Sequence, residues 1–385
     1  MQYIAAPSNA ERDSLRIKDL LLAYENESLF LAFRRFFPLP QREILRVANE
    51  QQIIDFIGEQ FRTSGGRVGI LLSSGVDSAI LAHFLPEGSI AYTMDYEGSY
   101  QKHSEFAGAA QFVPAGVVHK RVIIEREAYF AAIDELTLGR KAPTVPHEAA
   151  VYLAARQAKK DGVEVLAAGF GADGRLGGFP GLYKHTAPDA FKRQLFSLYV
   201  DPSRVLNEPA PIDWVFDQYT VDGQIDVKRF LTEVGTEGNS AREAIELAGL
   251  APLTPYTQLA YAGDFDPSRE PKYLLHHAFE LLYGHPPPYG ESALWVPYDD
   301  WFGGIQITRP EFQPGCVISK PVFMGQPRGV FRFLNRTARR TWREINNRLS
   351  KKKYFPGKQG YLLYSLARYF HFKAQEGWVT PDPRG

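Results

Sequence analysis

The chain contains 385 residues, of which 44% are apolar and 13% aromatic, enough for two domains or for one large domain with an appended lobe. Its 44 basic and 44 acidic residues leave no net charge, and a single cysteine, Cys316, excludes an internal disulfide framework, a multi-cysteine zinc site and an iron–sulfur cluster. No window is apolar enough for a membrane span and no secretory signal opens the chain, so a cytoplasmic location is expected.

Short apolar runs alternate with helical patterns in the first half of the chain. A helical pattern over 44–61 is followed by a glycine-rich turn at 63–67. We then expect four short strands, at 68–73, 89–96, 120–125 and 163–171. Helices are expected between them, at 78–85, 104–113 and 147–162. This alternation predicts an α/β fold, a parallel twisted sheet with helices on both faces.

Beyond Gly181 the pattern changes to longer helical segments that Pro and Gly interrupt, so a mostly helical C-terminal lobe is expected. We therefore predict an N-terminal extension at 1–60, a nucleotide-binding core at 61–181, a helical lobe at 182–327 and a basic aromatic segment at 328–385.

The turn after the first expected strand is built from small, hydroxylated and flexible residues with one carboxylate, in the order Ser73, Ser74, Gly75, Val76, Asp77 and Ser78. Backbone N–H groups and hydroxyls in such a turn can converge on a phosphate. Asp77 fits beside phosphates as a ligand of Mg²⁺, which usually binds one or two carboxylates together with phosphate oxygens. The alternative is an ordinary strand-to-helix turn with Ser78 as the helix N-cap.

The sequence SSGVDS resembles the loop S-G-G-x-D-S of the N-type ATP pyrophosphatases, with Ser74 replacing the first glycine. The resemblance implies the fold of that PP-loop class, cleavage of ATP between its α and β phosphates, and binding of the departing pyrophosphate by the loop. It also implies that Met94, near the end of the second strand, lines the adenine pocket; packing in the core is the alternative for Met94.

A second glycine-rich stretch, AAGFGADGRLGGF at 167–179, again follows an expected strand. It resembles the G-x-G-[AS]-D-x-x-x-G-G element of asparagine synthetase-like enzymes. The resemblance implies that Gly169, Phe170 and Gly171 contact the nucleotide and that Asp173 is a second Mg²⁺ ligand beside Asp77. The alternative is a glycine-rich loop with Asp173 at a helix start. The likeness extends weakly over residues 45–300.

The sequence departs from this family at three places. About sixty residues before the core are too few for a glutaminase domain, so nitrogen is expected from ammonia, a separate glutaminase partner or an amine substrate. Phe170 stands where the family has a glutamate or a tyrosine, so either another group is the base or the nucleophile arrives unprotonated. The family's loop lysine aligns with YGES at 289–292, and Lys272 or a cation of the basic segment is expected to replace it.

Residues 328–373 contain thirteen Lys or Arg and one acid, Glu344, interleaved with Phe, Trp and Tyr. Three interpretations stay open: a helix with buried aromatics and a solvated basic face, a nucleic-acid surface, or cations that close over the triphosphate, such as Arg339, Arg340 or Lys351–Lys353.

The main hypothesis is an AMP-forming ligase that uses ATP and Mg²⁺. A small-molecule or peptide carboxylate would attack the α-phosphorus, and an amine or ammonia would then form an amide, with catalytic roles for Asp77, Asp173 and Lys272. A carrier partner is also compatible with the sequence. Two alternatives remain: a nucleotide-binding partner protein without turnover, and an ATP-dependent tRNA-modifying enzyme.

Overall fold

The computed structural model describes residues 44–98, 104–198, 200–208, 213–217, 219–233, 238–266, 268, 271–288, 296–318, 353–355 and 357–378. All structural statements below refer to these residues.

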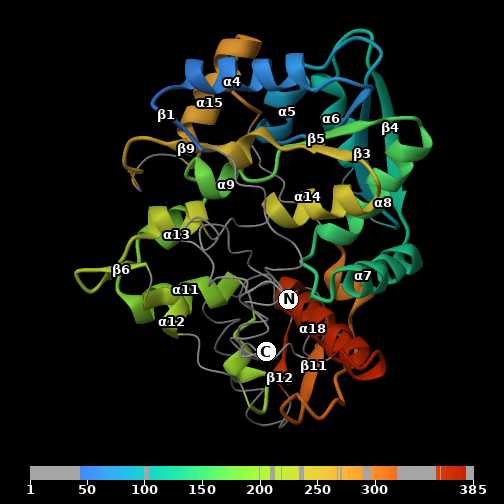
Figure 1. The fold of residues 1–385 in the computed structure, drawn as a ribbon, viewed down its shortest axis with the longest axis vertical. Helices are drawn as coiled ribbons and strands as arrows, with labels where there is room; N and C mark the ends of the chain where they lie inside the picture. The colour runs from blue at the N-terminus through green and yellow to red at the C-terminus, as the bar shows by residue number, and fades with distance from the viewer. Residues whose placement is uncertain are drawn as a thin grey trace, which may run out of the picture.

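Five parallel strands form the central sheet in the order β4-β3-β2-β5-β8 (Figure 1). Their bounds are β2 Val68–Leu71, β3 Ile90–Tyr96, β4 Val118–Ile124, β5 Val165–Ala168 and β8 Ala251–Leu253. The chain builds β2, β3 and β4 outward in one direction and then places β5 on the other side of β2. The strand order therefore reverses between β2 and β5, and open α/β sheets bind ligands at such a switch point, beyond the carboxyl ends of the strands. The predicted α/β fold is confirmed.

Helices cover both faces of the sheet because alternate strand residues point to opposite sides. Ile70 and Ala167 pack into one core cluster, while Leu71 and Leu166 pack into the other. On the first face lie α4 (Glu50–Thr63), α5 (Val76–Ala82) and α15 (Tyr273–Tyr283). On the second face lie α7 (Arg126–Arg140), α8 (Glu148–Lys160) and α14 (Gly238–Leu247). Figure 1 shows α4 and α15 above the sheet and α8 and α14 below it.

The first part of the expected helix over 44–61 is wrong. Leu45–Val47 forms strand β1, which pairs in parallel with β9 (Leu259–Tyr261). The helix starts only after Asn49, whose side chain accepts a hydrogen bond from the Gln52 backbone. The sheet also takes its fifth strand, β8, from beyond the expected boundary near 182. The four domain ranges remain predictions.

Short helices and small sheets make up the remainder of the described chain. The helices are α6 (Glu105–Ala109), α9 (Ala172–Arg175), α10 (Pro180–Tyr183), α11 (Pro188–Leu198), α12 (Asp213–Asp217), α13 (Val227–Glu233) and α16 (Tyr298–Trp301). The 3₁₀ turns are Ala110–Phe112, Pro202–Arg204 and Pro255–Gln258. Two small sheets contain β6 (Thr220–Val221) with β7 (Gln224–Ile225), and β10 (Ile305–Gln306) with β11 (Cys316–Ile318) and β12 (Lys353–Tyr354).

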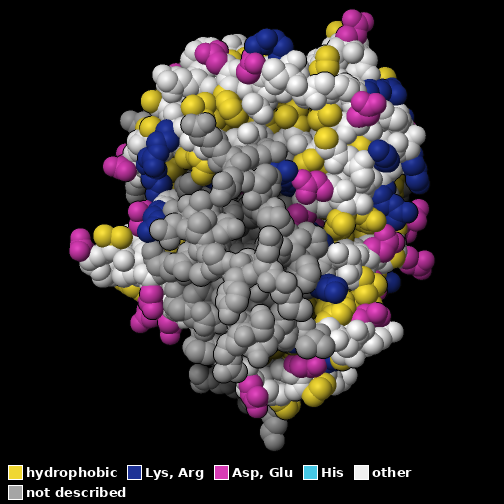
Figure 2. Space-filling model, viewed as in Figure 1, with side chains coloured by type: hydrophobic (Ala, Val, Ile, Leu, Met, Phe, Trp, Pro, Cys, Tyr) yellow, Lys and Arg dark blue, Asp and Glu magenta, His cyan; other side chains and the backbone are white. Residues whose placement is uncertain are grey.

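The described part of the basic segment is mainly helix α18 (Gly357–Gln375), which packs beside α7. Its aromatic residues Tyr361, Tyr369 and Phe370 are buried, so they do not offer stacking faces to a nucleic acid. Arg339, Arg340, Lys351 and Lys352 lie outside the described residues. Figure 2 shows acidic and basic side chains interspersed over the described part of the face in view. Among the described residues, no helix is long and apolar enough to cross a membrane.

The contact between α18 and the loop before α8 gives a stability prediction. The Thr144 backbone N–H donates to Ser365 Oγ at 2.6 Å, and both residues are fully buried. Ser365→Ala leaves this N–H without its acceptor, so the free energy of unfolding should fall by about 1–3 kcal/mol. Urea unfolding followed by circular dichroism measures the change. Ser268→Ala, at an exposed serine, is the control; equal effects of the two substitutions would contradict the account.

Candidate functional site

The turn Ser73–Ser78 lies directly after β2 and is closed by its own hydroxyls. Ser78 Oγ accepts from the Ser73 backbone N–H at 3.0 Å and lies 2.9 Å from Ser73 Oγ. The Gly75 N–H donates to Ser73 Oγ at 3.2 Å. Gly75 is the N-cap of α5, so the alternative that placed Ser78 at the N-cap is wrong. Ser78 folds back from the first turn of the helix and fixes the loop instead.

A carboxylate from another helix lies on this turn. Ser74 donates both its backbone N–H and its hydroxyl to Glu105 Oε1, each at 2.6 Å. Glu105 opens α6, which packs closely on the turn, since a Cβ added at Gly108 would lie 3.0 Å from the Ser74 side chain. The converging donors of the turn thus bind an anionic group from the protein, which shows that the turn can accept an anion.

Asp95, at the end of β3, holds Glu105 in this position. Its Oδ1 accepts from the Glu105 backbone N–H at 2.8 Å, and its Oδ2 pairs with Arg121 at 3.1 Å. Asp95 is almost fully buried, and Arg121 on β4 balances its charge. Strands β3 and β4 therefore fix the start of α6 above the turn.

The second glycine-rich stretch, at 167–179, packs against the Ser73–Ser78 turn because Gly169 leaves room. A Cβ at Gly169 would lie 3.1 Å from Asp77 Cβ. Within the second stretch itself, a Cβ at Gly178 would lie 2.2 Å from Asp173 Oδ1, so Gly178 leaves room for the Asp173 side chain. Gly171 has φ +98°, a backbone conformation that favours glycine. β5 pairs with β2, with Leu71 opposite Ala168, so both stretches leave the sheet side by side.

Lys272 joins the two aspartates. Its Nζ lies 3.0 Å from Asp77 Oδ2 and 2.9 Å from Asp173 Oδ1. The Lys272 side chain is 5% exposed, against 21% for Asp77 and 46% for Asp173. The structure thus brings together the three predicted catalytic residues from α5, α9 and the start of α15. Lys272 has φ +56°, which is costly for a lysine and indicates that the ion pairs hold its backbone there.

The site can hold Mg²⁺ through the same two aspartates. Their oxygens already share one positive centre, and an ion that keeps several waters needs only one or two carboxylates from the protein. Among the residues that the structure describes, no group of three or more His, Cys, Asp or Glu could hold a metal by itself. Asp77 and Asp173 would therefore hold Mg²⁺ together with phosphate oxygens from a nucleotide.

The other predicted nucleotide-binding residues lie nearby or in the core. Val76 is buried at the start of α5. Phe170 is half-buried and stacks on His147, with ring centroids 4.8 Å apart. Met94 is buried in β3 within the core cluster that packs under α8. The predicted YGES loop at 289–292 lies outside the described residues.

Glu105, Tyr256 and His147 were missed as site residues by the sequence analysis. The Tyr256 hydroxyl donates to the Asp77 carbonyl at 2.9 Å, and burial raises the Tyr256 pKa well above its usual value, which keeps it a donor. The pair Ser104–Glu105 has the sequence of a helix start, which gives the position of α6. Its contact with Ser74 joins residues 31 positions apart and has no local signal.

Comparisons with known proteins identify part of the chain. Residues 53–241 match the family model "Asparagine synthase". No curated protein matches the sequence. Among solved structures, an NH3-dependent NAD synthetase from Campylobacter jejuni is 17% identical and aligns over 34% of this chain with a TM-score of 0.22; the match spans 58% of the length of that protein. An NMN synthetase from Francisella tularensis is 16% identical over 52% of this chain and 90% of its own, with a TM-score of 0.24.

At TM-scores this low the two structures add nothing to the functional argument. The family match covers β2 to β5 and includes both aspartates of the site. Residues 53–241 are therefore similar to the asparagine synthase family, and the match supports an ATP-dependent amidating synthetase.

Proposed function

We propose that this chain is an AMP-forming ligase that activates a carboxylate with Mg–ATP and then forms an amide with ammonia or an amine. The observation that carries the proposal is the position of Lys272 Nζ between Asp77 and Asp173. This arrangement places one fixed cation and two candidate metal ligands beside a turn that already binds an anionic group.

In the first step a carboxylate oxygen attacks the α-phosphorus of ATP, and pyrophosphate leaves with the electrons of the broken P–O bond. The Ser73–Ser78 turn donates N–H and O–H groups to the leaving pyrophosphate. When bound, Mg²⁺ neutralises phosphate charge and polarises the phosphoryl oxygens. Lys272 provides the positive charge that the family's loop lysine would give, and it is held in place before the nucleotide arrives.

ATP and Glu105 compete for the same donors of the turn. Ser74 gives both of its donors to the Glu105 carboxylate, so a phosphate that binds there displaces that carboxylate. Asp77 and Asp173 would hold Mg²⁺ in the place where they hold Lys272, whose ammonium group would then contact phosphate.

A nucleotide-binding protein without turnover is the second candidate. Two observations favour it: Glu105 occupies the anion position of the turn, and Phe170 carries no proton to exchange. This candidate predicts that ATP binds, as measured by calorimetry, and that no carboxylate supports ATP–pyrophosphate exchange.

The first prediction for the proposed ligase concerns Lys272. Lys272→Gln removes a preorganised charge at the phosphates, so the rate of ATP–pyrophosphate exchange should fall by about 10²–10³-fold. The assay uses labelled pyrophosphate, Mg²⁺ and a panel of amino-acid and short-peptide carboxylates. Lys159→Gln, at an exposed lysine on α8, is the matched control. An exchange rate within threefold of the unsubstituted protein would exclude the role of Lys272.

The two aspartates give a prediction about the metal. Asp77→Asn and Asp173→Asn each remove one anionic oxygen ligand, so the Mg²⁺ concentration that gives half-maximal exchange should rise at least tenfold. Asp55→Asn, on the exposed side of α4, serves as the control and should leave it unchanged. An unchanged Mg²⁺ dependence in both site variants would show that these carboxylates do not hold the metal.

Substitution of Glu105 is expected to strengthen nucleotide binding, whereas the substitutions above weaken the activity. Glu105→Gln weakens the charged competitor of the phosphates, so α,β-methylene-ATP should bind about tenfold more tightly, the lower end of the value of a charge-assisted hydrogen bond. Isothermal titration calorimetry measures the dissociation constant, with Glu127→Gln on α7 as the exposed control. Equal or weaker binding by Glu105→Gln would place the phosphates elsewhere.

A further inference from the structure

His147 lies at the carboxyl edge of the sheet, in the loop that joins α7 to α8. It is the N-cap of α8, its side chain is 4% exposed, and its ring stacks on Phe170 at 27°. Phe170 follows Gly169, whose backbone packs against Asp77. The imidazole is thus one ring away from the proposed nucleotide site and beside the position where the family has a proton-exchanging group.

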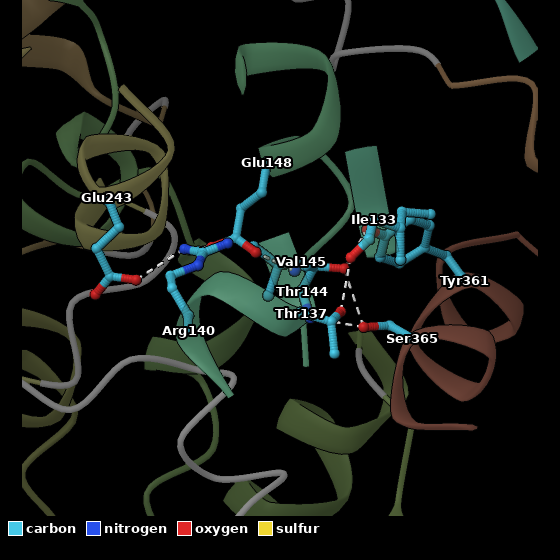
Figure 3. Close-up of polar contacts among 9 residues, drawn as sticks. All are labelled: Ile133, Thr137, Arg140, Thr144, Val145, Glu148, Glu243, Tyr361 and Ser365. Atoms are coloured by element: carbon cyan, nitrogen blue, oxygen red, sulfur yellow. Dashed lines mark hydrogen bonds and ion pairs between the residues drawn. The ribbon is translucent and has the colours of Figure 1, made fainter. Parts of the chain in front are cut away.

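The three residues before His147 are each fixed by a buried polar side chain, and Figure 3 shows the contacts of Thr144 and Val145. The Thr144 N–H donates to Ser365 Oγ, and Thr144 Oγ1 lies 2.6 Å from the Tyr361 hydroxyl. The Val145 N–H donates to Glu148 Oε2 at 2.8 Å. The Pro146 carbonyl accepts from the Tyr129 hydroxyl at 2.5 Å. Four elements, α7, α8, α18 and the loop itself, therefore set the position of His147.

Glu148 is held in turn by a buried charged cluster. Arg140 Nη1 donates to Glu148 Oε1 at 2.9 Å and to Glu243 Oε2 at 2.8 Å, and all three side chains are buried (Figure 3). Such clusters contribute little net stability because desolvation of the charges offsets their attraction, but they fix geometry. The loop that ends at His147 is therefore held by buried polar contacts as well as by packing, the kind of support that a precisely placed functional side chain needs.

We infer that His147 accepts the proton from the attacking amine in the amide-forming step of the proposed ligase. The amine lone pair forms the C–N bond at the activated carbonyl, the C–O bond to AMP breaks, and AMP keeps that electron pair. One N–H proton of the amine moves to a ring nitrogen of His147. Phe170 then has a function that needs no proton, since its ring orients the imidazole.

His119, on β4, is a partly buried histidine, and it fits this role less well. Its Nε2 lies 2.9 Å from Thr93 Oγ1, and its ring stacks on Phe106 at 3.9 Å. It lies opposite Ala91 near the amino end of β4, the edge strand of the sheet, and not at the carboxyl edge where the two aspartates lie. His147 is therefore the imidazole that the sheet topology places beside the glycine-rich stretch.

This inference rests on the proposed function, and a two-step test separates them. ATP–pyrophosphate exchange reports the first step, which precedes proton transfer from the amine. The second step is measured as amide formation at neutral pH, with methylamine or hydroxylamine and a carboxylate that supports exchange in the unsubstituted protein. After attack, the nitrogen of hydroxylamine is more acidic than that of methylamine and loses its proton readily to water. Hydroxylamine therefore depends less on a protein base.

His147→Gln should slow amide formation from methylamine by about 10²–10⁴-fold, the usual contribution of a general base, and hydroxamate formation by less than about tenfold. Exchange should persist in this variant, and His277→Gln, at an exposed histidine of α15, should leave both nucleophiles unaffected. His147→Asn repeats the comparison with a smaller side chain.

Three results would overturn the inference. Equal loss for methylamine and hydroxylamine in both variants would assign His147 a structural role. Loss of exchange together with amide formation would place its effect in folding or in the first step. Full methylamine activity would exclude it as the base. Absence of exchange in the unsubstituted protein with every carboxylate would instead contradict the proposed function itself, and the inference with it.

Discussion

The ion pairs of Lys272 with Asp77 and Asp173 are the interaction on which the site depends. Two carboxylates from neighbouring strand ends repel each other unless a cation lies between them. The strand order puts the two stretches at the switch point, and Gly169 lets them approach without a side-chain clash. Lys272 reaches both aspartates from the start of α15, a helix on the first face of the sheet. Its backbone is in the left-handed conformation.

A second contact near the site involves a negative side chain, the Glu105 carboxylate on Ser74. Glu105 gives the Ser74 donors a carboxylate, as Lys272 gives the aspartates an ammonium group. Each contact has the charge that one part of Mg–ATP would bring, a phosphate in one case and a divalent cation in the other. On the proposed function, Mg–ATP would bind by exchange with these two side chains.

The sequence was sufficient to predict the elements whose signals are local. Four strands of the sheet, the turn at Ser73–Ser78 and the second glycine-rich stretch follow from apolar runs that end in small residues. The pairing of Leu45–Val47 with β9 was not predictable, because three residues carry no periodic signal and the partner lies far along the chain. β8 was missed for the same reason, since it contains Pro252 and only three residues.

The candidate site divides in the same way. Asp77 could be named from the residues around it, and Asp173 and Lys272 from the family resemblance. The contacts of Ser74 with Glu105 and of Phe170 with His147 depend on how α6 and the loop before α8 pack on the turns. Each of these contacts joins residues from different elements, so only the folded arrangement shows them.

A crystal structure with Mg²⁺ and α,β-methylene-ATP tests the central claim most directly. The account predicts that the phosphates lie on Ser73–Ser78 in place of the Glu105 carboxylate. It also predicts that Mg²⁺ lies about 2.0–2.1 Å from oxygens of Asp77 and Asp173. Lys272 Nζ should then contact a phosphate. A bound nucleotide that leaves Glu105 on Ser74 and Lys272 between the two aspartates would contradict the account.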